Sequence, residues 1–204
     1  FMVDTIASLG TMEFEMDKWG VDLAVRAAQK GLMSPPGLSF NAVGPRAMAA
    51  HQTADLRTAY WDWTARMGDA HYLKYAGTPP EHLLFALEKS FEILNAETVE
   101  TATLRHKILA GATWAALDEW CKGGALEFNV PNGTERSTGV TAVLFNDGYT
   151  PEPLLQYCNE KCSVVIGIGI GALGGKAMRI AHMGYVNAPM LLGTLGVIEM
   201  GLQR

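Results

Sequence analysis

Short apolar runs separated by turn residues mark the beginning of the chain. Phe1–Asp4 is apolar until it stops at an acid, Trp19–Ala28 is rich in Val, Leu and Ala, and Leu38–Val43 follows a Pro-Pro-Gly turn. Runs of this length, bounded by turn residues, are typical of buried strands. The pattern therefore predicts three strands, followed by a short helix over Arg46–His51.

Patterns of helical period fill the middle of the chain. Residues 53–80 are irregular and rich in Tyr and Trp, and either Pro79 or Pro80 opens the next helix, because proline suits the first helical position. A further helix is predicted over residues 98–120 and ends at a Gly-Gly pair. On both helices, apolar residues spaced three and four apart predict the buried face. These faces consist of Leu83, Leu84, Leu87, Phe91 and Leu94, and of Leu104, Ile108, Leu109, Ala112, Ala116 and Trp120.

The remainder of the chain alternates between strands and helices. The predicted strands cover residues 125–130, 140–145, 163–170 and 176–182, and the predicted helices cover 150–162 and 187–202. The chain as a whole is therefore of the α/β class. A change of character near residue 96 divides it into residues 1–96, where strands alternate with short helices, and residues 97–204, with an α+β pattern.

Charge and cysteine content restrict the classes of protein. Lys and Arg number 16 against 21 Asp and Glu in 204 residues, and the net charge is −5. A net acidic chain without a basic run is a poor partner for nucleic acid. One nearly uncharged stretch, Ser163–Ala177, is too short and too rich in glycine to span a bilayer. Three cysteines do not make a disulfide framework, which favours a reducing, cytoplasmic compartment.

The chain opens inside a predicted strand. Position 1 is Phe rather than an initiator Met, and the first residues do not have the pattern expected of a signal sequence. We expect the N-terminal half of the protein to be missing from this chain and to be carried by the same or a separate chain. A non-catalytic split or truncated half is the alternative.

Three charged residues stand where a chemical role competes with a structural one. Lys30 is either a strand-end lysine that reaches solvent or a Schiff-base lysine, whose small neighbours leave room for a flat cofactor. Asp4 either caps the following turn or holds the pyridine nitrogen of pyridoxal phosphate. Arg179 is either a surface residue or a bidentate clamp on a substrate carboxylate.

These residues lie in motifs that span the chain. The motifs are Val3-Asp4, Gln29-Lys30-Gly31, Pro35-Pro36-Gly37, Tyr75-Ala76-Gly77-Thr78 and Gly174-Gly175-Lys176-Ala177-Met178-Arg179. In this order they resemble the class V aminotransferases of the type I pyridoxal-phosphate fold, nearest the serine–glyoxylate and alanine–glyoxylate aminotransferases. By this resemblance, residues 1–96 would be the C-terminal part of the large cofactor-binding domain with a connecting helix. Residues 97–204 would be the small C-terminal α+β domain.

The resemblance implies a set of cofactor contacts. Lys30 would form the Schiff base with pyridoxal 5'-phosphate and move the proton during the reaction. Asp4 would pair with the pyridine nitrogen, and Gln29 would contact the phosphate. Tyr75 and Thr78 would contact the cofactor phosphate of the partner subunit, so the working unit would be a homodimer with a shared site.

The resemblance also implies the reaction. Arg179 would bind the carboxylate of the amino donor and of the 2-oxo acid acceptor. An amino group would pass from a small amino acid (serine, alanine or aspartate) to glyoxylate or pyruvate, and a lyase or desulfurase of the same fold is the alternative. Two positions depart from the family, because Ala28 stands where a serine is common and Arg26 is unusual in its strand.

Other motifs carry weaker signals. Gly169–Gly174 has the spacing of the dinucleotide-binding fingerprint, but a strand rather than a helix follows, so we interpret it as a loop. Cys158 and Cys162 have no third ligand nearby, and the histidines lack metal-binding spacing, so we expect no metal site. His182 either lines the substrate site or makes structural hydrogen bonds.

Overall fold

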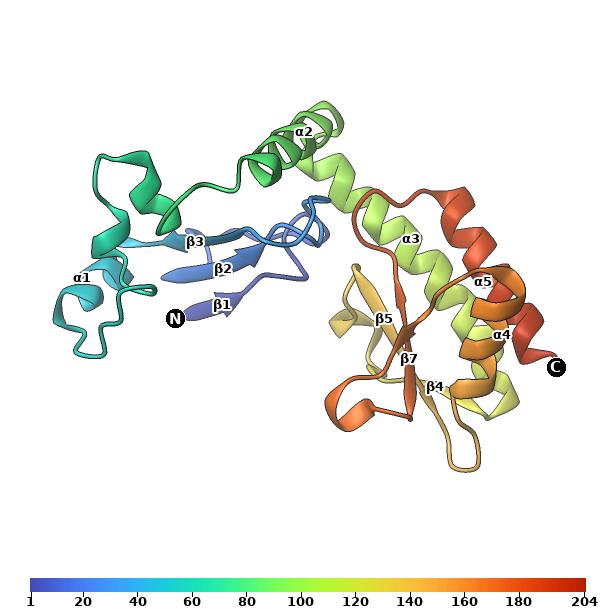
Figure 1. The fold of residues 1–204 in the computed structure, drawn as a ribbon. Helices are drawn as coiled ribbons and strands as arrows, with labels where there is room; N and C mark the ends of the chain where they lie inside the picture. The colour runs from blue at the N-terminus through green and yellow to red at the C-terminus, as the bar shows by residue number, and fades with distance from the viewer. The chain divides into compact units, whose positions relative to one another are not determined.

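The chain folds into two compact units. The computed structural model describes all 204 residues, which Figure 1 colours from the N-terminus to the C-terminus. The first unit comprises Phe1–Ile6 and Glu15–Ile93, and the second comprises Ala7–Phe14 and Leu94–Arg204. The chain therefore enters the second unit briefly near its beginning, before it completes the first.

A three-stranded sheet in the order β1-β2-β3 forms the first unit. β1 (Met2–Asp4) is parallel to β2 (Leu23–Ala27), and β3 (Ser39–Val43) is antiparallel to β2. Helix α1 (Pro45–Thr53) follows β3. The three predicted strands and the short helix are confirmed, although β2 is shorter than predicted because residues 16–20 form a turn.

Helix α2 (Glu81–Glu97) is confirmed, but its buried face differs from the predicted one. Leu87 and Leu94 are buried as predicted. Ser90 is buried beside them with 3% of its surface exposed, whereas Phe91 is 42% exposed. The prediction for Phe91 is wrong because a serine whose hydroxyl is hydrogen-bonded tolerates burial, and an apolar pattern does not count it.

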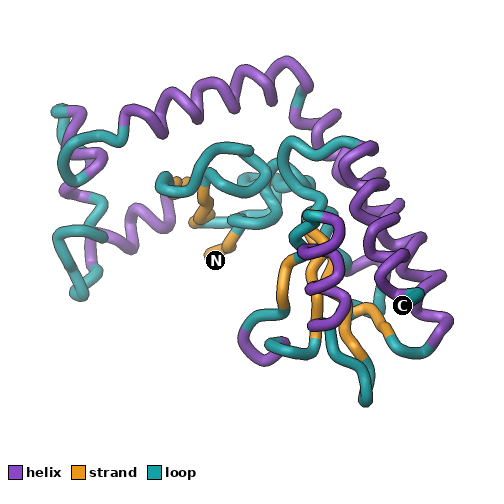
Figure 2. The backbone as a smooth tube through the Cα atoms, turned by 45° about the vertical axis from the view of Figure 1, so that its right-hand side comes forward, coloured by secondary structure: helices purple, strands orange, loops and turns teal.

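An antiparallel sheet covered on one face by helices forms the second unit (Figures 1 and 2). In the sheet order β4-β5-β7-β6, the strands are β4 (Leu126–Phe128), β5 (Val140–Phe145), β7 (Ala177–Ala181) and β6 (Gly167–Ile168). The helices are α3 (Val99–Trp120), α4 (Glu152–Cys162) and α5 (Ala188–Leu202). β6 is much shorter than predicted because only Gly167 and Ile168 of the range 163–170 pair with β7, and Ser163 ends α4 in the left-handed conformation, with φ 55°.

The core of the second unit lies between the sheet and its helices. Val143 of β5 pairs with Met178 of β7, so both side chains point to the same face, and both are fully buried. Leu117 of α3 and Ile198 of α5 belong to the same cluster. Burial of each such side chain contributes about 1.5–3 kcal/mol to stability. None of the helices combines the length and the apolar character needed to cross a bilayer.

The buried face of α3 contains polar side chains. Leu104 and Ile108, which the apolar pattern places inward, are 56% and 62% exposed. His106 and Thr113 are buried instead, and each contacts the backbone carbonyl one turn before it. The prediction for Leu104 and Ile108 is wrong because Nδ1 of His106 and the hydroxyl of Thr113 have partners within the helix, so both polar residues can be buried.

Candidate active site

Asp4 and Lys30 follow neighbouring parallel strands. Asp4 is the last residue of β1, and Lys30 comes three residues after the end of β2 at Ala27. The register places Asp4 beside Val25, so the carboxyl ends of both strands meet at one edge of the sheet. Ligands of open α/β sheets bind outside this edge. The structure therefore brings the predicted acid and amine to the same edge of one sheet.

Both side chains retain free polar atoms. Oδ1 of Asp4 accepts a hydrogen bond from the amide N–H of Ile6 at 2.8 Å, which is the capping contact that the sequence allowed. Its Oδ2 accepts none, and the side chain is exposed. Lys30 is half-buried, and its Nζ makes no hydrogen bond or ion pair within the chain. A carboxylate oxygen and an amine thus remain available for a ligand.

Backbone hydrogen bonds fix the turn that carries Lys30. The amide of Met33 donates to the carbonyl of Lys30 at 2.9 Å, and the amide of Ser34 donates to the carbonyl of Ala28 at 3.1 Å. Met33 has φ 60°, a left-handed conformation that costs a non-glycine residue about 1–2 kcal/mol. Gln29, next to Lys30, is exposed. Strain of this kind is concentrated at functional sites, which agrees with a role for this turn.

A buried guanidinium ties the ends of β1 and β2 together. Arg26 is 3% exposed, and its Nη1 donates to the carbonyl of Thr5, the residue after Asp4, at 3.3 Å. Burial lowers the pKa of Arg26 to about 10, so its side chain stays charged at neutral pH. The amide and the hydroxyl of Thr5 both donate to the carbonyl of Val25 at 2.9 Å. Sequence reasoning noted Arg26 as unusual but missed this role beside Asp4.

Tyr75 and Thr78 lie between α1 and α2. Tyr75 ends a short 3₁₀ helix, His71–Tyr75, and Thr78 stands shortly before α2. Both side chains are exposed, and no hydrogen bond joins either of them to the residues at the sheet edge. The structure thus leaves both free to contact a group outside this chain.

A polar cluster anchors the segment that carries Tyr75 to α1. Nε2 of His51 lies 2.9 Å from Oγ1 of Thr64 and 3.2 Å from Oδ1 of Asp62. The amide N–H of Thr64, together with Arg57, holds the pKa of Asp62 below its usual range. The carboxylate of Asp62 is therefore charged near neutral pH and fixes the fold of the segment.

A large hollow of the first unit lies beside its sheet. It has a volume of about 710 Å³ and lies between the strands, α1 and the indole rings of Trp61 and Trp63. Asp4 and Lys30 do not line it.

Arg179 projects from the face of β7 that points away from the core. Its pairing partners are Ala142 of β5 and Gly167 of β6, whereas its neighbours Met178 and Ile180 are buried on the opposite face. Nε of Arg179 donates to the carbonyl of Ile168 at 2.7 Å. Its two Nη groups make no hydrogen bond or ion pair within the chain, so the end of the fork is available for an anion.

Gly169 is required for the loop that supports Arg179. A Cβ at this position would lie 2.0 Å from the carbonyl oxygen of Leu173, which is backbone and cannot rotate away. We expect Gly169→Ala to lower the free energy of unfolding by about 1–3 kcal/mol, measured by urea denaturation. Gly123→Ala is the matched control, because a Cβ at Gly123 meets nothing within 4 Å. Equal stability of the two variants would contradict the prediction.

The glycine-rich segment has the loop structure that we predicted. Residues 169–174 connect β6 to β7 through a single 3₁₀ turn, Gly171–Leu173. A dinucleotide fingerprint needs a helix at this point, and here the chain returns as an antiparallel strand. The interpretation as a loop is confirmed.

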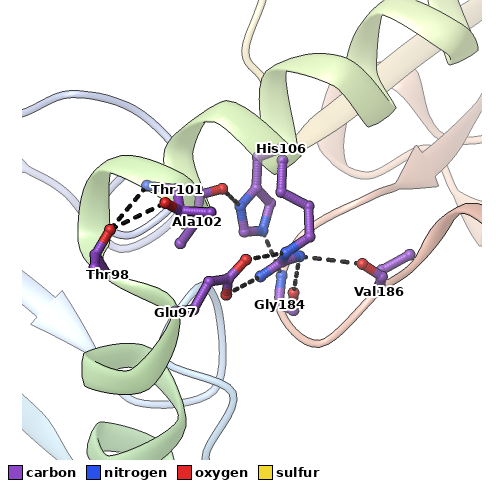
Figure 3. A network of polar contacts seen from close by, with 8 residues as sticks. Glu97, Thr98, Thr101, Ala102, His106, Gly184 and Val186 are labelled. Atoms are coloured by element: carbon purple, nitrogen blue, oxygen red, sulfur yellow. Dashed lines mark hydrogen bonds and ion pairs between the residues drawn. The ribbon is translucent and has the colours of Figure 1, made fainter.

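A network of polar contacts holds the loop after β7 (Figure 3). Arg105 bonds both carboxylate oxygens of Glu97, at 2.6 and 2.9 Å. Its Nη1 also donates to the carbonyls of Gly184 and Val186, at 2.9 and 3.1 Å. Nε2 of His106 accepts a hydrogen bond from the amide of Gly184 at 3.0 Å. The network therefore fixes the segment that follows the strand of Arg179.

His182 has a structural role in the second unit. It is fully buried, and its ring nitrogens lie 2.9 Å from Oγ1 of Thr141 and 2.8 Å from the carbonyl of Thr138. Trp114 donates to the same hydroxyl of Thr141 at 3.1 Å. Of the two roles that the sequence allowed, the structure supports hydrogen bonding within the core.

The buried histidines make stability depend on pH. Burial lowers the pKa values of His106 and His182 in the folded chain, whereas the unfolded chain titrates near 6.5. Below that pH the unfolded chain binds more protons, so stability is retained above pH 6.5 and falls as the pH drops below it. We expect a loss of up to about 1.4 kcal/mol per pH unit for each histidine, measured by urea denaturation between pH 7.5 and pH 5.

An exposed histidine provides the control for this pH dependence. His82 on α2 is exposed, so His82→Gln should leave the dependence of stability on pH unchanged. A free energy of unfolding that stays constant from pH 7 to about pH 5 would contradict the prediction.

Comparison with known protein families identifies the chain. The sequence profile described as aminotransferase class V matches residues 1–184. The chain belongs to the class V aminotransferases. Members of this family depend on pyridoxal phosphate, and the resemblance stated from the sequence motifs is confirmed.

Relatives of known activity match almost the whole chain. The L-aspartate–glyoxylate aminotransferase of Paracoccus denitrificans is 34% identical over 97% of this chain and 49% of its own length. The serine–glyoxylate aminotransferase of Methylorubrum extorquens is 31% identical over 98% of this chain and 50% of its own length. This class V aminotransferase chain therefore spans about half the length of these relatives.

A solved structure confirms the fold. The alanine–glyoxylate aminotransferase of Nostoc sp. superposes with a TM-score of 0.84 and 26% identity, over 98% of this chain and 53% of that protein. The predicted α/β fold of the type I pyridoxal-phosphate enzymes is thereby confirmed for this class V chain.

The residues at the sheet edge fit the cofactor of the family. The aldehyde of pyridoxal phosphate needs an amine, and its pyridine nitrogen needs an acid. Nζ of Lys30 and Oδ2 of Asp4 are an amine and a carboxylate oxygen without partners, and they follow adjacent parallel strands. The donor set of this class V chain therefore matches the two reactive ends of the cofactor ring.

Proposed function

We propose that the complete protein is a pyridoxal-phosphate-dependent aminotransferase that moves an amino group from serine, alanine or aspartate to glyoxylate or pyruvate. The observation that carries the proposal is the shared sheet edge of Asp4 and Lys30 in a chain of this family. Relatives named as amino acid–glyoxylate aminotransferases support the substrate class. When bound, pyridoxal phosphate supplies an electron sink for the bond pair left at the α-carbon of the amino donor.

In this proposal, residues of the first unit hold the cofactor and move the proton. Lys30 Nζ would supply the amine that holds the cofactor, and it would take the proton from the α-carbon of the amino donor. The carboxylate of Asp4 holds a proton on the pyridine nitrogen. Gln29 would contact the phosphate, and the hydroxyls of Tyr75 and Thr78 would contact the cofactor phosphate of the partner subunit. The exposure of these last three residues leaves them accessible for such contacts.

Arg179 binds the substrate carboxylate in this proposal. Its Nη groups have no partner in the chain, and a guanidinium fork binds a carboxylate with two parallel hydrogen bonds. Amino donor and 2-oxo acid acceptor share this carboxylate, so one arginine serves both halves of the reaction.

We further propose a homodimer with a site shared between subunits. The segment between α1 and α2 exposes Tyr60, Trp61 and Tyr72, and their exposed fractions are 64%, 76% and 59%. Exposed aromatic side chains of this density are typical of protein interfaces. The same segment carries Tyr75 and Thr78, so burial of these rings against a partner would bring the two side chains to its cofactor.

The domain assignment and the location of the protein are also proposals. Residues 1–96 form the C-terminal part of the large domain, and residues 97–204 form the small domain.

Three free cysteines support a reducing, cytoplasmic compartment. Burial raises the pKa of the Cys121 and Cys158 thiols, which keeps both protonated.

The proposal is tested by trapping the cofactor on its lysine. The complete protein, loaded with pyridoxal phosphate, is reduced with borohydride, digested and examined by mass spectrometry. We expect the pyridoxyl group on Lys30, together with loss of the visible absorbance. Attachment to another lysine, or no attachment, would contradict the assignment of Lys30.

The substrate class and the alternatives are tested separately. A panel of amino donors with glyoxylate or pyruvate should yield the corresponding 2-oxo acids, whereas a lyase or desulfurase would release ammonia or sulfide from single substrates. Titration of this chain alone with pyridoxal phosphate, combined with size-exclusion chromatography, tests the non-catalytic alternative. A complete protein that binds no cofactor would favour that alternative.

A further inference from the structure

A serine occupies the buried stripe of α2. Residues 83, 87, 90 and 94 follow one another at helical spacing, and three of them are leucines. Ser90 is the fourth, and its 3% exposed surface makes it as buried as its neighbours Leu87 and Leu94. Packing alone favours an apolar side chain here, because a hydroxyl without a partner costs about 1–3 kcal/mol in such a place.

The partner of Ser90 lies next to Lys30. Oγ of Ser90 donates a hydrogen bond to the carbonyl of Leu32, which is 58 residues away in sequence and two residues after Lys30. Leu32 is itself buried. The bond therefore connects the body of α2 to the middle of the turn that carries the amine.

A second contact joins the same helix to the same loop. A Cβ at Gly37 would lie 2.6 Å from Cδ1 of Leu83, so the loop passes close to the first turn of α2. Between these two contacts, Met33 keeps its left-handed φ of 60°, which needs support from surrounding structure. Part of that support is the hydrogen bond from Ser90 to the carbonyl of Leu32, the residue immediately before Met33.

We propose that Ser90 is a positioning residue for Lys30, an inference that rests on the proposed function. The hydroxyl fixes the carbonyl of Leu32 and thereby the direction in which the turn presents the lysine. Without it, the carbonyl of Leu32 is buried without a donor, and the turn shifts to reach water. A misplaced amine transfers protons less well, although the side chain that reacts is unchanged.

The test compares Ser90→Ala with a matched control in the cofactor-loaded complete protein. Thr113→Ala removes another buried hydroxyl that bonds a backbone carbonyl, but in α3 of the second unit. Both variants lose stability. We expect only Ser90→Ala to shift the pH midpoint of the visible cofactor absorbance and to lower kcat roughly tenfold, with the KM for the amino donor unchanged. Ser90→Cys, which retains a weak donor of similar size, should be intermediate and covers the case in which Ser90→Ala does not fold.

The outcomes separate this inference from the proposed function. If the wild-type protein shows no visible absorbance linked to Lys30, the proposed function fails and the inference fails with it. If the wild-type protein shows that absorbance, but Ser90→Ala and Thr113→Ala have the same pH midpoint and kcat, Ser90 is only structural and the inference alone is overturned. If Ser90→Ala does not fold, Ser90→Cys with the wild-type pH midpoint and kcat, but with a loss of stability equal to that of Thr113→Ala, would overturn it equally.

Discussion

Lys30→Ala is expected to abolish turnover. In the proposed mechanism the variant loses the amine that attaches the cofactor and moves the α-proton, and the loss of proton transfer alone would lower the rate by roughly 10²–10⁴-fold. Because Lys30 Nζ makes no hydrogen bond or ion pair within the chain, the substitution should change the free energy of unfolding little. The measurement is the steady-state rate with serine or alanine and glyoxylate, together with the visible absorbance before and after borohydride.

A surface lysine provides the control. Lys122 is exposed and pairs only with Glu119, so Lys122→Ala should keep the wild-type rate and absorbance. Lys30→Arg tests whether the charge is sufficient, and we expect it to be inactive because a guanidinium does not form the covalent link. A rate of turnover in Lys30→Ala near that of the wild type would contradict the assignment of Lys30 as the reacting amine.

Arg179→Gln is expected to weaken the binding of substrate without releasing the cofactor. Hydrogen bonds between charged groups contribute about 1.5–3 kcal/mol, so the KM for the amino donor should rise roughly 10- to 150-fold. The visible absorbance should stay unchanged, because no cofactor contact is assigned to Arg179. Steady-state kinetics with each donor, and with the 2-oxo acid acceptor, measure both effects.

The control for Arg179 is another arginine of the second unit. Arg136 lies over the ring of Phe128 and donates to two backbone carbonyls, so its role is structural. Arg136→Gln should lower stability and leave the KM values unchanged. An equal rise of KM in both variants would mean that the effect of Arg179→Gln comes from a weakened fold. Arg179→Lys should recover only part of the affinity, since an ammonium lacks the planar fork.

The sequence predicted the order and type of the elements well, but it predicted buried faces less well. Apolar runs and turn residues identify the three strands of the first unit and the long helices because period and propensity are local properties. Ser90 is buried because its hydroxyl donates to the carbonyl of Leu32 in a distant segment, whereas His106 and Thr113 are buried beside carbonyls one turn earlier in α3. An apolar pattern contains no information on distant hydrogen-bond partners or on the rotation of a helix, so it does not predict that such polar residues are buried.

The candidate site likewise combines features that the sequence predicts with features that it does not. A residue that ends a predicted strand can be located from sequence, and two parallel strands bring Asp4 and Lys30 to one edge. The bond from Arg26 to the carbonyl of Thr5 has no sequence signal beyond an unusual charge in an apolar run. The face on which Arg179 projects depends on register, because a slip of one residue reverses the sides of a strand. The excursion of residues 7–14 into the second unit likewise has no counterpart in the pattern.

The serine in the stripe of α2 also determines how the helix is rotated about its own axis. Adjacent helical residues differ by about 100° in direction, so a helix turned by one position would bring Phe91 inward and carry Ser90 toward solvent. That arrangement would bury the ring of Phe91, but it would also leave the carbonyl of Leu32 buried without a hydrogen-bond donor. The packing with the rotated helix is therefore less stable, and the hydroxyl of Ser90 favours a single rotation of this amphipathic helix about its axis.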